Sequence, residues 1–323
     1  MRSLPFNKFQ AGFSLIELMV ALVLGLFIVG GVMVVFVSSS HSFSFNESLS
    51  RAQESGRFAL EIIARDLRNA GYKGDCFSNV KSLLDTSSAD YHRAIDAYDL
   101  NDSLKGWSDE AGAFFNGTLQ DYRANTDLLL VKHAATASTA ELSEDISSTD
   151  ISFPITGGEG SGTLLVFSDA GGCDLFQNTA AQNASSLERG RDGQSINNRG
   201  QSLSHGYRSG GSTRITRFIS SLFYIGSSDR SASISALRAV SYNNGIANDQ
   251  ELVEGVTGMN LHYALEPVAG EALDYTVTTA QVTAADRWDE VIAVRVNLTV
   301  AVQGIQSLPH QFSTTVALRN RLP

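Results

Sequence analysis

The chain has 323 residues, a formal net charge of −10, and hydrophobic residues at 43% of its positions. This length is enough for one or two domains with a sizeable core. The excess of acidic residues argues against general nucleic-acid binding, because affinity for phosphate comes from Lys and Arg.

The N-terminus predicts a membrane element. Residues 1–12, MRSLPFNKFQAG, contain Arg2 and Lys8 and no acid, and an apolar run from Phe13 to Val37 follows. The run is long enough to span a bilayer as one helix. No A-x-A-like cleavage site follows it at the distance typical of a secretory signal. Because the basic residues precede the run, the N-terminus is expected to stay cytoplasmic and the rest of the chain to lie outside.

Glu17 lies inside the apolar run and is not explained by a simple signal anchor. A charge at the centre of a membrane helix costs about 2.5–3.5 kcal/mol, and such charges have a specific partner. A positive charge brought close by assembly would serve. A free α-amino group at Phe13, made by cutting after Gly12, would supply that charge.

The stretch GFSLIELMVALVLG, residues 12–25, resembles the class III signal of type IV prepilins and type II secretion pseudopilins. The resemblance implies that a prepilin peptidase cuts between Gly12 and Phe13 and methylates the new N-terminal residue. It also implies that Glu17, the fifth residue of the mature chain, supports subunit assembly.

The segment after the run predicts the second half of a long helix. No Pro occurs between Phe13 and Gly71, and Gly71 suits a helix C-terminus. We expect a membrane and assembly half over 13–37 and an amphipathic half over 38–71, with weak points at Gly30–Gly31 and Ser38–Ser44. Apolar residues recur at roughly helical spacing at Leu49, Ala52, Phe58, Leu60, Ile62, Ile63 and Leu67.

From Thr126 the apolar period changes to two, which predicts strands. The expected strands are 126–134, 162–169, 213–226, 234–243, 252–265, 289–302 and 310–320. This alternation predicts a mostly antiparallel sheet with one face on a core and one face exposed to solvent. The amphipathic half of the helix is expected to pack on this sheet. The predicted fold is α+β, with a head over 72–323. Residues 134–162 and 177–213 read as long polar loops.

Three segments resemble PilW-type minor pilins of the type IV pilus: residues 56–76, 252–265 and 312–321. The resemblance implies a type IV pilin-like fold and a structural subunit that primes or caps pilus assembly. The implied partners are other minor pilins, the major pilin, prepilin peptidase, membrane lipid and the inner-membrane assembly machinery. The subunit would first be a single-pass inner-membrane protein with a periplasmic head, and then part of the pilus fibre at the cell surface.

Two alternatives remain open from the sequence. One is a type II secretion pseudopilin, whose short periplasmic fibre moves substrates. The other is a pilus-tip subunit that binds glycan or DNA, because the long loops could hold a binding site. Detection of the protein in sheared surface pili would separate the pilus subunit from the pseudopilin.

The two cysteines, Cys76 and Cys173, exclude a cysteine-rich metal site. In an exported head they are expected to form a disulfide, and two buried free thiols are the alternative. The six histidines show no short metal-ligand spacing, and no serine lies in a GxSxG step, so we expect no enzyme activity, metal or cofactor. These histidines are His41, His92, His133, His205, His262 and His310.

A cluster of arginines within thirty residues suggests a docking patch for an acidic neighbour or for DNA. A solvated loop is the alternative. The cluster comprises Arg189, Arg191, Arg199, Arg208, Arg214 and Arg217.

Overall fold

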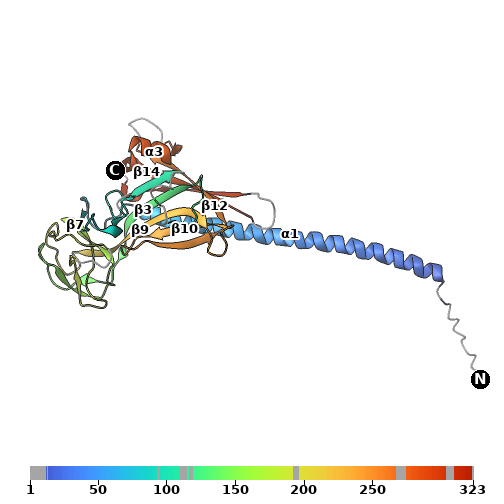
Figure 1. The fold of residues 1–323 in the computed structure, drawn as a ribbon, viewed down its shortest axis with the longest axis horizontal. Helices are drawn as coiled ribbons and strands as arrows, with labels where there is room; N and C mark the ends of the chain where they lie inside the picture. The colour runs from blue at the N-terminus through green and yellow to red at the C-terminus, as the bar shows by residue number, and fades with distance from the viewer. Residues whose placement is uncertain are drawn as a thin grey trace, which may run out of the picture. The chain divides into compact units, whose positions relative to one another are not determined.

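A computed structural model describes residues 12, 14–92, 95–108, 115, 119–191, 196–266, 274–302 and 309–321 (Figure 1). The chain divides into two compact units. One comprises Met1–Arg51 with Gln303–Gln306, and the other comprises Ala52–Val302 with Ser307–Pro323. Helix α1, Leu15–Asn69, contributes residues to both units.

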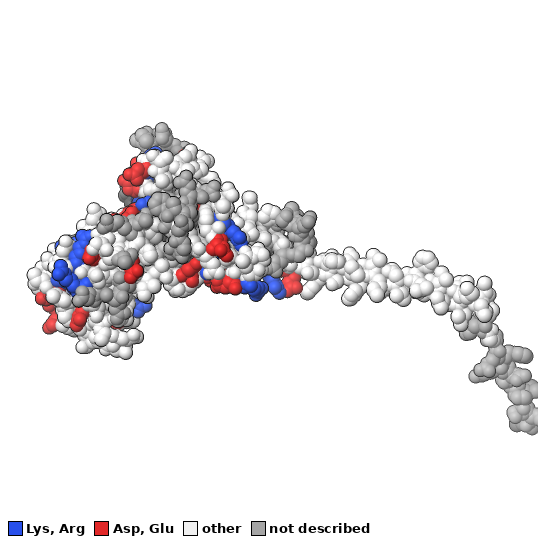
Figure 2. Space-filling view, viewed as in Figure 1, with Lys and Arg blue, Asp and Glu red and all other residues white. Residues whose placement is uncertain are grey.

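In the first unit, α1 is an uninterrupted helix. It continues through Gly30–Gly31 and Ser38–Ser44, the two segments expected to be weakest, and Ser42 Oγ donates to the Ser38 carbonyl at 2.9 Å. The sequence has no Asp, Glu, Lys or Arg between Glu17 and Glu47, and Figure 2 shows this part of the helix as a largely uncharged surface. Its large apolar side chains from Leu15 to Val37 are 48–80% exposed.

The second half of α1 buries a narrow stripe of mostly small residues. The stripe comprises Ala52, Gly56, Ala59, Ile63, Ala64 and Leu67. Phe58, which the apolar pattern placed on the buried face, is 56% exposed, so that expectation is wrong. Gly56 explains the choice of face, because a Cβ there would lie 2.7 Å from Cγ of Phe312. Small residues let the helix backbone approach the sheet closely.

The end of α1 has partners for its last carbonyl groups. Gly71 adopts a left-handed φ of 76°, and the Tyr72 amide donates to the Asn69 carbonyl at 2.9 Å. The Asn320 side chain donates to the carbonyls of Asn69 and Ala70. The predicted helix C-terminus near Gly71 is therefore confirmed, and the C-terminal segment of the chain covers it.

The largest sheet has eight strands. Its main path runs β1 (Lys81–Ser82), β7 (Gly172–Gln177), β6 (Leu164–Asp169), β9 (Arg214–Ser227), β10 (Ser235–Ser241) and β11 (Asn248–Glu254). Strand β3 (Asp127–Ala137) also pairs with β9 and carries β2 (Leu104–Ser108). All pairs are antiparallel except β1 with β7.

Strand β9 makes the sheet fork. Strand β3 follows one of its edges from Thr216 to Phe223. On the other edge of β9, the pairing with β6 extends to Arg217, and the pairing with β10 starts at Ser221. Residues 218–220 of β9 therefore lie opposite neither β6 nor β10, and the segment after β10 reaches Ser220, where the Tyr242 amide donates to the Ser220 carbonyl at 2.9 Å.

Two smaller sheets complete the head. The four-stranded sheet has the order β13 (Val277–Thr278), β12 (Val256–Leu265), β14 (Val291–Val300) and β15 (His310–Ala317). The three-stranded sheet contains β4 (Glu141–Leu142), β5 (Ser152–Thr156) and β8 (Ser186–Glu188). The remaining helical elements are η1 (Ala89–Tyr91), α3 (Thr279–Ala285), η3 (Trp288–Glu290) and η4 (Arg319–Arg321).

This architecture confirms the α+β prediction and corrects it locally. The segment 252–265, expected as one strand, divides at Gly255, whose φ of 89° ends β11 and starts β12 in a different sheet. The two segments expected as loops, 134–162 and 177–213, contain the whole three-stranded sheet. Their strands are too short to show an apolar period.

Two apolar cores lie on opposite faces of the same strands. On β6, Leu164 and Val166 belong to one core, whereas Leu165 and Phe167 belong to the other. The first core also contains Tyr91 and Tyr98, and the second contains the buried apolar residues of the three-stranded sheet, among them Phe153. Burial on both faces explains why β6 reads as a continuous apolar run.

Candidate functional site

The start of α1 pairs Ser14 with Glu17. The Ser14 amide donates to Glu17 Oε2 at 2.9 Å, and the Glu17 amide donates to Ser14 Oγ at 3.3 Å. This reciprocal pattern is a capping box, and it satisfies amide groups that the first turn of a helix leaves free. The carboxylate also lies at the positive end of the helix dipole. Glu17 thus has a partner within its own subunit.

Sequence reasoning missed this role, although the signal was present. Ser14-Leu15-Ile16-Glu17 fits the pattern Ser-x-x-Glu before an apolar run. The resemblance to prepilins predicts only an assembly role for Glu17. Gly12 is exposed, and a Cβ built on it meets nothing within 4 Å. Phe13 lies outside the described residues, so the proposed cleavage and methylation point is described only on its Gly12 side.

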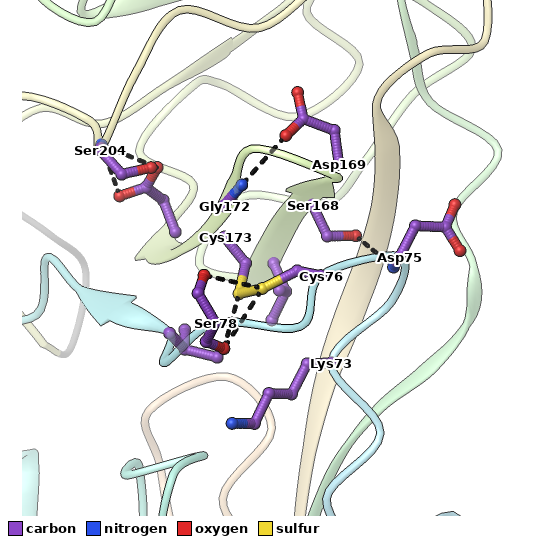
Figure 3. Close-up of a disulfide and its surroundings, with 12 residues drawn as sticks. Lys73, Asp75, Cys76, Ser78, Ser168, Asp169, Gly172, Cys173 and Ser204 are labelled. Carbon is purple, nitrogen blue, oxygen red and sulfur yellow. Dashed lines mark hydrogen bonds between the residues drawn. A yellow bond between two sulfur atoms is a disulfide. The ribbon is translucent and has the colours of Figure 1, made fainter. Parts of the chain in front are cut away.

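The structure joins Cys76 and Cys173 in a disulfide, with their Cα atoms 5.8 Å apart (Figure 3). Cys76 belongs to the segment that leaves α1, and Cys173 belongs to β7. The bond lies next to the parallel pairing of β1 with β7, where Lys81 is opposite Asp174. It therefore joins the segment that follows the long helix to β7 of the large sheet, across a sequence separation of 97 residues.

A hydrogen-bonded cluster holds the long polar segment beside β7. The buried carboxylate of Asp174 accepts from the Ser204 amide at 2.9 Å, from Ser204 Oγ at 2.6 Å and from the Tyr207 hydroxyl at 2.7 Å. His205 Nδ1 lies 2.9 Å from Ser204 Oγ, and its Nε2 lies 2.9 Å from Asp169 Oδ1. Burial, followed by the charge of Asp174, raises the pKa of Tyr207.

The Ser204 cluster resembles a Ser-His-Asp arrangement but is better read as a fastening. The Ser204 hydroxyl donates its proton to Asp174 in a short hydrogen bond. The same proton is therefore not directed at His205, as a catalytic serine would require. The described parts of the chain contain no group of three His, Cys, Asp or Glu residues that could hold a metal ion.

The six arginines do not form one uniform patch. Arg189 is buried, and its guanidinium donates to the carbonyls of Asp150 at 2.8 Å and Gln201 at 2.6 Å, so it fastens the loop and is not part of a docking surface. Arg214 pairs with Asp75 at 2.8 Å, and Arg217 with Glu159 at 2.9 Å.

The other three arginines have no ion pair within the described residues. Arg191 and Arg208 are exposed, and Arg199 donates to Thr86 Oγ1 at 2.5 Å. Figure 2 shows both basic and acidic side chains over the end of the head that holds β7. The docking patch stays a prediction, restricted to the arginines that reach the surface.

A buried ionisable pair links α1 to β3. His133 Nε2 lies 4.0 Å from Asp66 Oδ1, and the two side chains are 6% and 14% exposed. The Nδ1 atom of His133 bonds to the Ala134 carbonyl at 2.9 Å. Burial lowers the pKa of His133 and raises that of Asp66, and each effect is partly opposed by the attraction between the pair.

Comparison with family models agrees with this architecture at both ends of the chain. A model described as the prokaryotic N-terminal methylation motif matches residues 7–33, and one described as Type IV Pilus-assembly protein W matches residues 222–309. These two matches support a PilW-like type IV pilin with a prepilin signal. No curated protein and no solved structure matches it.

The two matched ranges correspond to distinct parts of the pilin. The first covers residues 7–12 and the exposed apolar turns of α1 up to Met33. The second contains β10 to β14 with α3, and so includes most of the four-stranded sheet. Of the three PilW-like segments recognised in the sequence, 252–265 lies inside the match, whereas 56–76 and 312–321 lie outside it.

Proposed function

We propose that this pilin is a minor pilin, a structural subunit that primes or caps assembly of a type IV pilus. The observation that carries the proposal is the exposed apolar surface of α1 between Leu15 and Val37, most of which lies inside the matched N-terminal methylation motif. Such a surface needs a cover of lipid or of other apolar helices, because exposure to water is unfavourable. In a pilus subunit, lipid would cover this surface before assembly, and the apolar helices of other subunits would cover it in the fibre.

The proposed life of the subunit has three stages. The basic leader keeps the N-terminus cytoplasmic and the head in the periplasm, with α1 crossing the inner membrane. Prepilin peptidase then cuts between Gly12 and Phe13 and methylates Phe13. The assembly machinery finally moves the helix from lipid into the fibre, where other minor pilins and the major pilin surround it.

The proposed role of Glu17 is to fix axial register. Within one subunit its carboxylate caps the helix start through Ser14. A carboxylate has about four lone-pair sites, so it can accept further donors. In the fibre the α-amino group of a neighbouring Phe13 would be such a donor, in surroundings where a charge-assisted hydrogen bond is strong.

The cleavage step is tested by replacing Gly12 with Val in the full chain. We expect the variant to keep residues 1–12 and to run as a longer precursor, because a branched side chain would obstruct a peptidase that requires Gly. The measurement is mass spectrometry of the N-terminal peptide, which in wild type should begin at N-methylated Phe13.

The control is Gly25→Val, because Gly25 lies in α1 and, like Gly12, has no atom within 4 Å of a Cβ built on it. It should be cut normally. A Gly12→Val protein with the wild-type N-terminal peptide would refute the proposed cleavage.

A further inference from the structure

The fork in the large sheet contains a pocket of about 650 Å³. Residues 217–219 of β9 line it on one side. They lie where the part of β9 that pairs with β6 ends and before the part that pairs with β10 starts. The turn from β10 to β11 lines the other side through Asn243, Ile246 and Asn248. Pockets of about 300–1,000 Å³ are the usual size for small-ligand sites. The pocket lies entirely within the head.

One wall of the pocket contains the guanidinium of Arg217, which a buried carboxylate holds in place. Arg217 Nε donates to Glu159 Oε2 at 2.9 Å, and the Glu159 side chain is completely buried. Ser138 Oγ donates to the other oxygen of the same carboxylate. This arrangement fixes Arg217 and leaves its two terminal nitrogens without a partner among the described residues. It also neutralises the Arg217 charge, so the pocket wall offers donors without a net charge.

The opposite wall offers amides. Asn243 Oδ1 accepts from the Ser220 amide at 3.0 Å, which orients the side chain, and its Nδ2 has no partner in the described part of the chain. Asn248 is exposed at the start of β11, and the described residues give its side chain no hydrogen bond. Each amide has both a donor and an acceptor group. Ile246, 58% exposed, adds an apolar surface beside them.

We propose that this pocket binds a neutral saccharide of one or two sugar units. Sugar hydroxyls both donate and accept, which matches Asn amides and the free nitrogens of Arg217. The C–H face of a sugar ring needs an apolar contact, which Ile246 supplies. An anion would have to compete with the buried carboxylate of Glu159 for Arg217, so the paired charge favours a neutral ligand.

This inference goes beyond the minor-pilin role and does not depend on it. The pocket uses head residues alone, whereas the assembly proposal rests on residues 12–37. A subunit that binds sugar and fails to enter pili would separate the two proposals, and so would the opposite result.

The test uses the full-length protein in a detergent without a sugar headgroup. It is applied to a glycan array that carries neutral and acidic saccharides, and the best neutral saccharide is then titrated calorimetrically. We expect binding to at least one neutral saccharide. Asn248→Trp should abolish it by filling the pocket. Ile246→Ala should lower the association constant about tenfold by removing apolar contact.

Two matched controls accompany these variants. Ile151→Ala removes an isoleucine with the same 58% exposure outside the pocket, and Asn260→Trp changes an exposed asparagine on β12. Both should bind as wild type, and all four variants should melt at the wild-type temperature. The proposal is overturned if no neutral saccharide binds, if only acidic saccharides bind, or if Asn248→Trp binds as well as the controls.

Discussion

At the scale of single residues, Glu17 serves its own helix through Ser14 before it meets any neighbour. This changes the energetic argument for a carboxylate in an apolar run. The amide of Ser14 and the helix dipole offset part of the cost in the isolated subunit. In the proposed assembly, a neighbouring subunit would therefore need to stabilise the charge by less than its full membrane penalty.

Two substitutions separate capping from pairing between subunits. Glu17→Gln keeps a side chain suited to a capping box and removes the negative charge. We expect it to insert into the membrane normally and to be depleted from sheared pili. Ser14→Ala keeps the charge and loses the cap, which costs about 0.5–2 kcal/mol of helix stability, and we expect it to enter pili.

The measurement for both variants is the ratio of subunit in sheared pili to subunit in membranes. If Glu17→Gln appears in pili at the wild-type ratio, charge pairing between subunits is not required. If Ser14→Ala is depleted from pili to the same extent as Glu17→Gln, then incorporation depends on the helix cap that Glu17 forms and not on its charge.

At the scale of elements, the packing of α1 on β15 depends on one missing side chain. Gly56→Ala would gain about 1 kcal/mol in helix propensity. Its Cβ would, however, lie within the ring of Phe312, and overpacking costs about 1–3 kcal/mol. We expect a net loss of stability, measured by denaturant unfolding of the full-length protein. Gly30→Ala, with open space at the Cβ, is the control and should leave the head unchanged.

Adding Phe312→Leu to Gly56→Ala should recover part of the loss, because the smaller side chain makes room for the new methyl group. A Gly56→Ala protein at least as stable as wild type would show that the helix can shift away from β15 at little cost.

The Asp66–His133 pair gives the α1–β3 contact a pH dependence. Because burial lowers the pKa of His133, its neutral form is favoured in the folded state. This contribution is fully present above the ordinary value of 6.5 and is lost as the pH falls through the lower folded value. Asp66, whose pKa is raised, acts in the opposite direction as the pH falls towards its ordinary value of 3.8.

We expect His133→Gln to reduce the loss of stability below pH 6.5. The measurement is the free energy of unfolding at about pH 7.5 and about pH 5.5. His262→Gln, a change on the wet side of β12, should retain the wild-type difference between the two values. Equal pH dependence in both variants and wild type would show that His133 does not control it.

Elements with a clear apolar period were predictable from the sequence. Short strands, and a segment whose two halves belong to different sheets, were not. The strand containing Ile292 to Val300 alternates cleanly and was predicted. The break at Gly255 was missed, because a glycine inside a regular pattern does not reveal that β11 and β12 belong to different sheets. Small residues gave no signal either, because most of the buried stripe of α1 is Gly and Ala, whereas the apolar pattern favoured Phe58.

At the scale of the whole molecule, the membrane element and the head followed from composition and period, whereas the sites did not. The role of Gly12 and Phe13 came from a resemblance. The fork pocket came only from the structure, because it joins Thr163, Arg217 and Asn248, which no sequence spacing links. Arg189 looked like a surface charge and proved buried, since carbonyl groups far along the chain satisfy its guanidinium.

The disulfide is expected to stabilise the head as a whole. Closing a loop with a sequence separation of 97 residues is worth about 4–5 kcal/mol in the chain-entropy model. Replacing Cys76 and Cys173 together by Ser should lower the free energy of unfolding by an amount of that order. Denaturant unfolding measures it, with a reductant-treated wild type as the second sample. An unchanged unfolding midpoint in both samples would refute the expectation.

The same bond has a mechanical consequence. A pulling force applied at the two ends of the chain would pass from Cys76 directly to Cys173. The loop between them, a separation of 97 residues, would carry no load. At roughly 3.3–3.6 Å per extended residue, the bridge withholds on the order of 300 Å of slack. A subunit stretched past the rupture of its fold would thus lengthen by about a third less than its sequence allows.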